Sequence, residues 1–93
     1  MPVGLLTLEL HIAEAESLKD KRQVLRSLKE RLRAHYNVAV AELDFAETWQ
    51  RSVVGVVTLS NEEQQVEEVL QRVLAEADRI LGRMMVSHSV EFL

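Results

Sequence analysis

The chain has 93 residues, no cysteine and a net charge of −4, with 47% hydrophobic and 28% charged residues. These values predict one globular domain over residues 1–93 and exclude a disulfide scaffold, a Cys-ligated zinc site and a thiol nucleophile. No apolar run approaches the ~18 residues of a membrane span and no secretory signal is visible, so we expect a cytoplasmic protein without a membrane partner.

Residues 3–12 alternate between an apolar face and a mixed face. The apolar positions, two residues apart, are Leu6, Leu8, Leu10 and Ile12. A period of two is typical of a β-strand with one buried side.

Residues 17–33 have the period of an amphipathic helix. Ser17 is suited to the N-cap position, and Asp20 three residues later completes a capping-box pattern. The shared apolar face consists of Leu18, Leu25, Leu28 and Leu32. We expect the helix to end near Tyr36, with Asn37 in the left-handed conformation that often follows a helix.

A second stripe on this helix is cationic. Its members, spaced three or four residues apart, are Lys19, Arg22, Arg26, Lys29 and Arg33. Like charges four residues apart destabilise a helix by roughly 0.2–0.5 kcal/mol per pair. The stripe therefore suggests either an anionic partner or neutralisation by carboxylates elsewhere in the chain.

Residues 37–44 and 51–60 predict two further strands, joined by residues 45–50 in a long hairpin. In the later strand, Val53, Val57 and Leu59 point to one side, and Val54 and Val56 point to the other. A strand that is apolar on both faces is expected at the centre of a sheet.

Residues 61–82 form an acidic helical segment that is capped by Ser60 or Asn61 and ends at Gly82. A last strand follows over residues 84–92. The order β-α-β-β-α-β predicts an α+β, ferredoxin-like two-layer sandwich, in which two helices cover one face of a four-stranded antiparallel sheet.

Several segments resemble the YlxP-like family of small bacterial proteins. They are SLKDKR (17–22), LKERLR (28–33), VAE (40–42), WQR (49–51) and VL (69–70). The resemblance covers nearly the whole chain and implies a ferredoxin-like fold. Genes of that family often lie beside genes for transcription elongation, translation initiation and ribosome maturation, and the family has no established activity from which catalytic residues would be transferred.

Two functional hypotheses follow. In the first, the chain is a non-enzymatic accessory protein that binds RNA or a ribosomal particle through Lys19, Arg22, Arg26, Lys29 and Arg33. The competing interpretation of this stripe is that it is merely solvated or is paired with the acidic second helix.

In the second hypothesis, the chain is a self-associating module, a homodimer with no nucleic-acid ligand. Apolar residues on both sides of the third strand suggest that part of the uncovered sheet face is covered, either by Trp49 and Phe45 folding over it or by a second copy packed there as a symmetric dimer. The residues expected at this contact are Phe45, Trp49, Val54 and Val56.

Enzymatic chemistry has little support in the sequence. Glu9 and His11 share a strand face and His88 lies on the last strand, but without a third ligand, a nucleophile or a pocket they form no recognisable site. No phosphate-binding loop or dinucleotide fingerprint is present. We therefore expect no catalytic residues, metal or cofactor.

Overall fold

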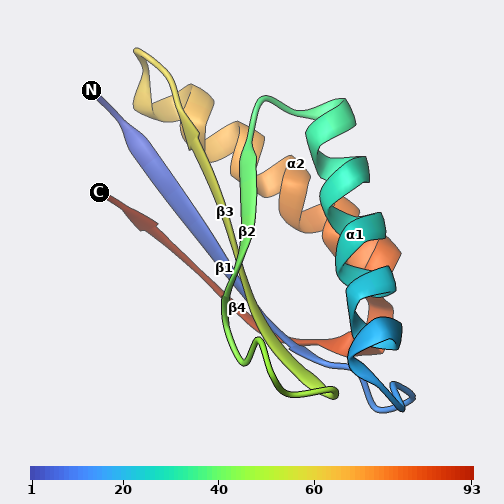
Figure 1. Cartoon of the computed structure of the whole chain (residues 1–93). Coiled ribbons are helices and arrows are strands. Elements are labelled where there is room, and N and C mark those ends of the chain that lie inside the picture. Colours follow the sequence, from blue (N-terminus) through green and yellow to red (C-terminus); the bar gives the residue numbers. More distant parts are fainter.

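The computed structural model describes all residues, 1–93, as two helices packed on one face of a four-stranded sheet (Figure 1). The elements in chain order are β1 (Val3–His11), α1 (Leu18–His35), β2 (Ala39–Asp44), β3 (Arg51–Leu59), α2 (Glu63–Leu81), a 3₁₀ turn (Gly82–Met84) and β4 (Met85–Phe92). The strands lie in the order β2-β3-β1-β4, and every neighbouring pair is antiparallel. The predicted ferredoxin-like fold is confirmed.

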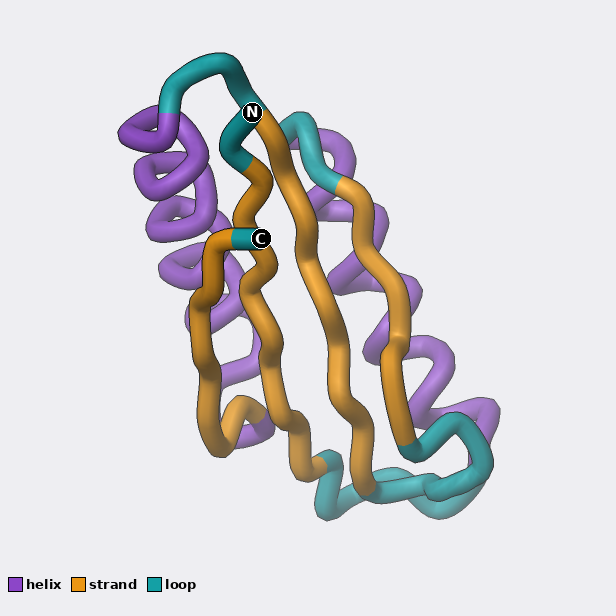
Figure 2. Tube along the Cα trace, turned by 90° about the vertical axis from the view of Figure 1, so that its left-hand side faces the viewer, coloured by secondary structure: helices purple, strands orange, loops and turns teal.

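The core lies between the sheet and the helices. The predicted apolar face of β1 is buried there, with Leu6 and Leu8 fully inaccessible. Val54 and Val56 of β3 lie on the same side and are also buried, opposite Leu8 and Leu6 in the β1–β3 register. The other face of the sheet is uncovered, as Figure 2 shows with both helices behind it.

Helix α2 packs closely on β1 because Gly4 has no side chain. A Cβ atom at Gly4 would lie 2.6 Å from Cγ1 of Val66 and 2.8 Å from Cδ1 of Leu70. The glycine thus allows two buried residues of α2 to rest directly on the strand.

Ser17 is the N-cap of α1 as predicted, but the reciprocal bond of the predicted capping box is made to Glu16 and not to Ser17. The hydroxyl of Ser17 accepts a hydrogen bond from the amide of Asp20 at 3.1 Å, and Asp20 Oδ2 accepts from the amide of Glu16 at 2.9 Å. At the other end the prediction for Asn37 is wrong: Tyr36 is the C-cap in an extended conformation, and Asn37 does not have a positive φ. The chain leaves α1 directly toward β2 and needs no left-handed residue there.

Helix α2 begins at a different cap from the one expected. Glu62 occupies the N-cap position without a side-chain cap bond, although the hydroxyl of Ser60 accepts from the amide of Glu62 at 3.3 Å. Gly82 ends the helix with a φ of 54°, a value that favours glycine.

A lysine is buried where α1 meets the β2–β3 hairpin. Lys21 is 1% exposed, and its ammonium donates to Glu42 Oε2 at 2.9 Å and to the carbonyl of Phe45 at 2.7 Å. The carbonyls of Ala46 and Arg51 lie 3.4 Å from the same nitrogen. One side chain of α1 therefore holds both ends of the hairpin connection, and a buried charge is tolerable only with such partners.

The same hairpin connection is also attached to the segment that precedes α1. The side-chain amide of Gln50 donates to the carbonyls of Ala13 and Ala15 at 3.0 and 3.3 Å. The backbone carbonyl of Gln50 accepts from the amide of Ile12 at 2.8 Å. These bonds and Lys21 fix the position of β2 relative to α1.

Replacement of Lys21 by methionine should lower the free energy of unfolding by about 3 kcal/mol, because the carboxylate of Glu42 and the loop carbonyls would lose their shared donor. Urea denaturation measures this change. Lys19→Met, on the exposed side of the same helix, is the matched control and should change stability by less than ~0.5 kcal/mol. Equal losses in the two variants would contradict a structural role for Lys21.

Ser17→Ala should lower the free energy of unfolding by about 1 kcal/mol, because the amide of Asp20 loses its capping acceptor. The same denaturation assay measures this effect, and Ser17→Asp should retain most of the stability because aspartate is an equally good N-cap. A stability loss in Ser17→Asp as large as in Ser17→Ala would show that the cap is not the cause.

Candidate cationic groove

The five cations predicted on α1, here called the cation row, reach solvent. The row comprises Lys19, Arg22, Arg26, Lys29 and Arg33, of which Lys29 is half-buried and the others are exposed. The carboxylates of the chain make two close contacts with basic side chains, the Lys21–Glu42 ion pair and the His35–Glu76 contact, and neither involves the row. The cation row is therefore not neutralised by direct pairing within the molecule.

Pairing with the acidic second helix, one of the two competing interpretations of the row, is absent from the structure, whereas simple solvation of the row agrees with its exposure. The contact between a basic side chain of α1 and a carboxylate of α2 joins His35 Nδ1 to Glu76 Oε1 at 3.0 Å, at the end of α1. Most carboxylates of α2 are exposed, and none of them lines the hollow beside the row. The acidic surface and the cation row thus occupy different parts of the molecule.

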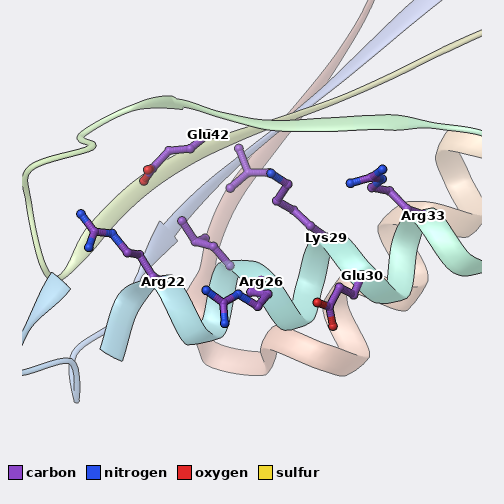
Figure 3. A pocket seen from close by; sticks show the side chains of 8 residues that line it. Arg22, Arg26, Lys29, Glu30, Arg33 and Glu42 are labelled. Carbon is purple, nitrogen blue, oxygen red and sulfur yellow. The ribbon is translucent and has the colours of Figure 1, made fainter. Parts of the chain in front are cut away.

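Four members of the row line a groove between α1 and β2 (Figure 3). The groove has a volume of about 370 Å³, and its lining residues are Arg22, Leu25, Arg26, Lys29, Glu30, Arg33, Glu42 and Val54. Arg22, Lys29 and Arg33 reach from α1 toward β2 in this view. Lys19 is exposed but lies outside the groove.

A carboxylate stands on the strand side of this cationic groove. Oε2 of Glu42 accepts hydrogen bonds from Lys21 Nζ at 2.9 Å and from the hydroxyl of Ser52 at 2.6 Å. Its side chain is 23% exposed, and Oε1 has no hydrogen-bond partner within the molecule. The structure thus places one fixed, available acceptor among several cations.

Sequence reasoning did not identify Lys21, Glu42 and Ser52 as a unit, although a signal was present. Lys21 lies four, seven and eleven residues before the buried Leu25, Leu28 and Leu32, a spacing that places it on the apolar face of α1. Glu42 and Ser52 likewise have the strand parity of buried valines. Polar residues at three core positions point to a buried polar network.

The uncovered sheet face carries several large apolar side chains. Leu43 is 54% exposed and Leu59 is 56% exposed, and Trp49, in the connection between β2 and β3, is 51% exposed. Leu43 lies across Gly55, where a Cβ atom would come within 2.7 Å of Leu43 Cδ1. Val53 and Val57 are half-buried on the same face.

Two residues expected at a self-association contact must be corrected. Val54 and Val56 are 2% and 0% exposed because their strand parity directs them toward the helices. Neither can meet another copy. Phe45 is half-buried with the Arg51 guanidinium 4.1 Å from its ring centre, while Trp49 remains available on the surface.

Of the residues considered for acid–base chemistry, His88 is separated from Glu9 and His11. Glu9 and His11 line a hollow of about 270 Å³ on the uncovered face, and Glu9 accepts a hydrogen bond from the hydroxyl of Ser87 at 2.9 Å. His88 pairs with Leu8 and therefore faces the helix side of the sheet. The structure contains no group of three or more His, Cys, Asp or Glu side chains that could hold a metal ion.

Neither helix is long and apolar enough to cross a membrane.

Solved structures share the fold at low sequence identity. A Bordetella bronchiseptica protein, provisionally described as an antibiotic biosynthesis monooxygenase, superimposes with a TM-score of 0.59 and 12% identity over 100% of this chain and 96% of that chain. A dimeric ferredoxin-like protein of unknown function from Thermobifida fusca gives a TM-score of 0.53 and 14% identity, over 98% and 90% of the two chains. At such identities the likeness concerns the fold alone.

Sequence comparison gives a closer relationship. The protein described as "Uncharacterized protein YlxP" of Bacillus subtilis (strain 168) is 40% identical over 76 residues, which cover 82% of this chain and 83% of that protein. Residues 3–89 match the family described as "Protein of unknown function (DUF503)". The chain therefore belongs to this YlxP-like family, DUF503.

Proposed function

We propose that the protein is a non-enzymatic accessory factor that binds RNA, free or in a ribonucleoprotein particle, through the cationic groove. The observation that carries this proposal is the row of cations without carboxylate partners along one wall of the groove. Lysine and arginine side chains at helical spacing suit the successive phosphates of a nucleic-acid backbone.

Repulsion within the row supports the same function. Arg22 and Arg26, and likewise Lys29 and Arg33, are like-charge pairs four residues apart. Each pair costs the helix a few tenths of a kcal/mol. A bound polyanion would remove that cost, and it would find a locally positive surface on a molecule whose net charge is −4.

RNA binding by the wild-type protein should fall steeply with salt, with a slope of about −3 for log K against log salt concentration if four phosphates are neutralised. Fluorescence anisotropy with a labelled RNA oligonucleotide measures this slope. The triple variant Arg22→Glu, Arg26→Glu, Lys29→Glu should bind at least roughly tenfold more weakly, because reversed charges repel the backbone.

The matched control is Arg72→Glu, Arg79→Glu, Arg83→Glu, which changes the net charge equally at exposed positions away from the groove. Its affinity should remain close to that of the wild type. A triple variant of the groove that binds RNA as well as this control would refute the proposed function.

A second candidate function is self-association through the uncovered sheet face. The exposed Leu43 and Leu59 on this face, and the exposed Trp49 in the connection between β2 and β3, favour it, because association removes exposed apolar surface from water. The similar fold from Thermobifida fusca is described as dimeric. Because the sheet face and the groove are separate surfaces, a homodimer would leave both copies of the groove free to bind RNA.

Sedimentation velocity at micromolar concentration should then show a dimer, and Leu59→Asp should shift it to monomer, because a buried carboxylate is costly at an apolar interface. Val90→Asp is the control, since Val90 is 46% exposed but lies on the helix side of the sheet. A wild-type protein that sediments only as monomer would refute this second candidate.

A further inference from the structure

Glu42, on β2, is one of two carboxylates in the groove, the other being Glu30 on α1. Its Oε2 atom is held by Lys21 and Ser52, so the carboxylate cannot rotate freely. Its Oε1 atom has no partner within the molecule. Figure 3 shows this carboxylate on β2, across from the Arg22 side chain on α1.

An acceptor in this position distinguishes among anionic ligands. A ligand that offers only negative groups would meet the cations of α1 but be repelled by Glu42. A nucleic acid offers phosphates and also, on the edges of its bases, neutral N–H groups. Carboxylates accept hydrogen bonds from these N–H groups. The combination of a cationic wall and a fixed carboxylate therefore matches a polynucleotide strand whose base edges are free.

A base-paired nucleic acid would not offer Glu42 a free base edge. In a duplex the pairing edges are occupied, and in A-form RNA the major groove is too narrow for side chains to enter. Single strands present their Watson–Crick edges to protein acceptors. The groove contains no aromatic side chain, so its arginine planes are the surfaces on which bases can stack.

We propose that the groove binds single-stranded RNA with its phosphates along α1, and that Glu42 Oε1 accepts a hydrogen bond from the exocyclic amino group of a base, which makes Glu42 the base-selecting residue. This inference rests on the proposed RNA-binding function. Cytosine carries the amino group N4, which can donate to Glu42 Oε1. Uracil has the carbonyl oxygen O4 in its place, and two acceptor oxygens cannot form a hydrogen bond. The site thus selects cytosine over uracil.

An extended acidic peptide is the main competing ligand, because β2 is an edge strand whose outer backbone groups are free to pair with another strand. Strand addition takes its specificity from pockets for alternate side chains. This groove offers only Leu25 and Val54 as apolar lining, and Glu30 and Glu42 would repel acidic side chains. The observations therefore favour RNA.

The test compares oligocytidylate and oligouridylate of equal length in competition for the full-length wild-type protein, measured by fluorescence anisotropy. The two strands carry the same number of phosphates, so the cation row cannot distinguish them. We expect oligocytidylate to bind about fivefold more tightly, the effect of one base-edge hydrogen bond. A blunt GC duplex of the same length should bind more weakly than oligocytidylate.

Two variants test whether Glu42 is the residue that causes the preference for oligocytidylate. Glu42→Gln should bring the ratio of the two affinities close to one, because a side-chain amide can both accept from cytosine N4 and donate to uracil O4. Glu67→Gln makes the same change of charge at an exposed position of α2 outside the groove, so it should keep the preference. Thermal denaturation checks that both variants fold, and the wild-type comparison needs neither of them.

The outcomes separate this inference from the proposed function. If the two strands bind with equal affinity, base selection by Glu42 is refuted while RNA binding stands; tighter binding of the duplex would refute the single-strand assignment. If neither strand nor the duplex binds, the proposed function itself fails. Tighter binding of oligoglutamate than of any RNA would assign the groove to an acidic protein partner and overturn both.

Discussion

The buried ammonium of Lys21 determines how the β2–β3 hairpin sits against α1. Removing a lysine from water costs several kcal/mol unless its charge and its hydrogen bonds are satisfied. Here the carboxylate of Glu42 supplies the opposite charge, and carbonyls of the hairpin connection supply further acceptors. Together with the hydrogen bonds of Gln50, this side chain fixes the position of β2 relative to α1 and hence the width of the cationic groove.

This arrangement also explains why the groove remains cationic. The nearest carboxylate on the strand side is engaged by Lys21, a residue that lies beneath the surface, and by Ser52. It is therefore not paired with the surface cations of α1. The acidic residues of α2 do not pair with the cation row either. The carboxylate of Glu76 contacts α1 at His35, at the C-terminal end of that helix.

Several residues in the segments that resemble the family stabilise the contact between α1 and the β2–β3 hairpin. Ser17 caps α1, Lys21 and Glu42 form the buried pair, and Gln50 ties the hairpin connection to the segment before α1. Other parts of the same segments, Arg22, Lys29 and Arg33, line the groove. The segments thus combine the residues that fix the groove with those that give it its charge.

The local pattern of the sequence was sufficient for the element order, the buried face of β1, the cap at Ser17 and the stop at Gly82, because periodicity and capping depend on residues within a few positions of each other. It also placed the cation row on one flank of α1. Only the tertiary structure decided that Lys21 is buried, that Val54 and Val56 face the helices, and that no carboxylate neutralises the row. These properties depend on which strand lies beside which helix and in which register, and such contacts join residues that are far apart in the chain.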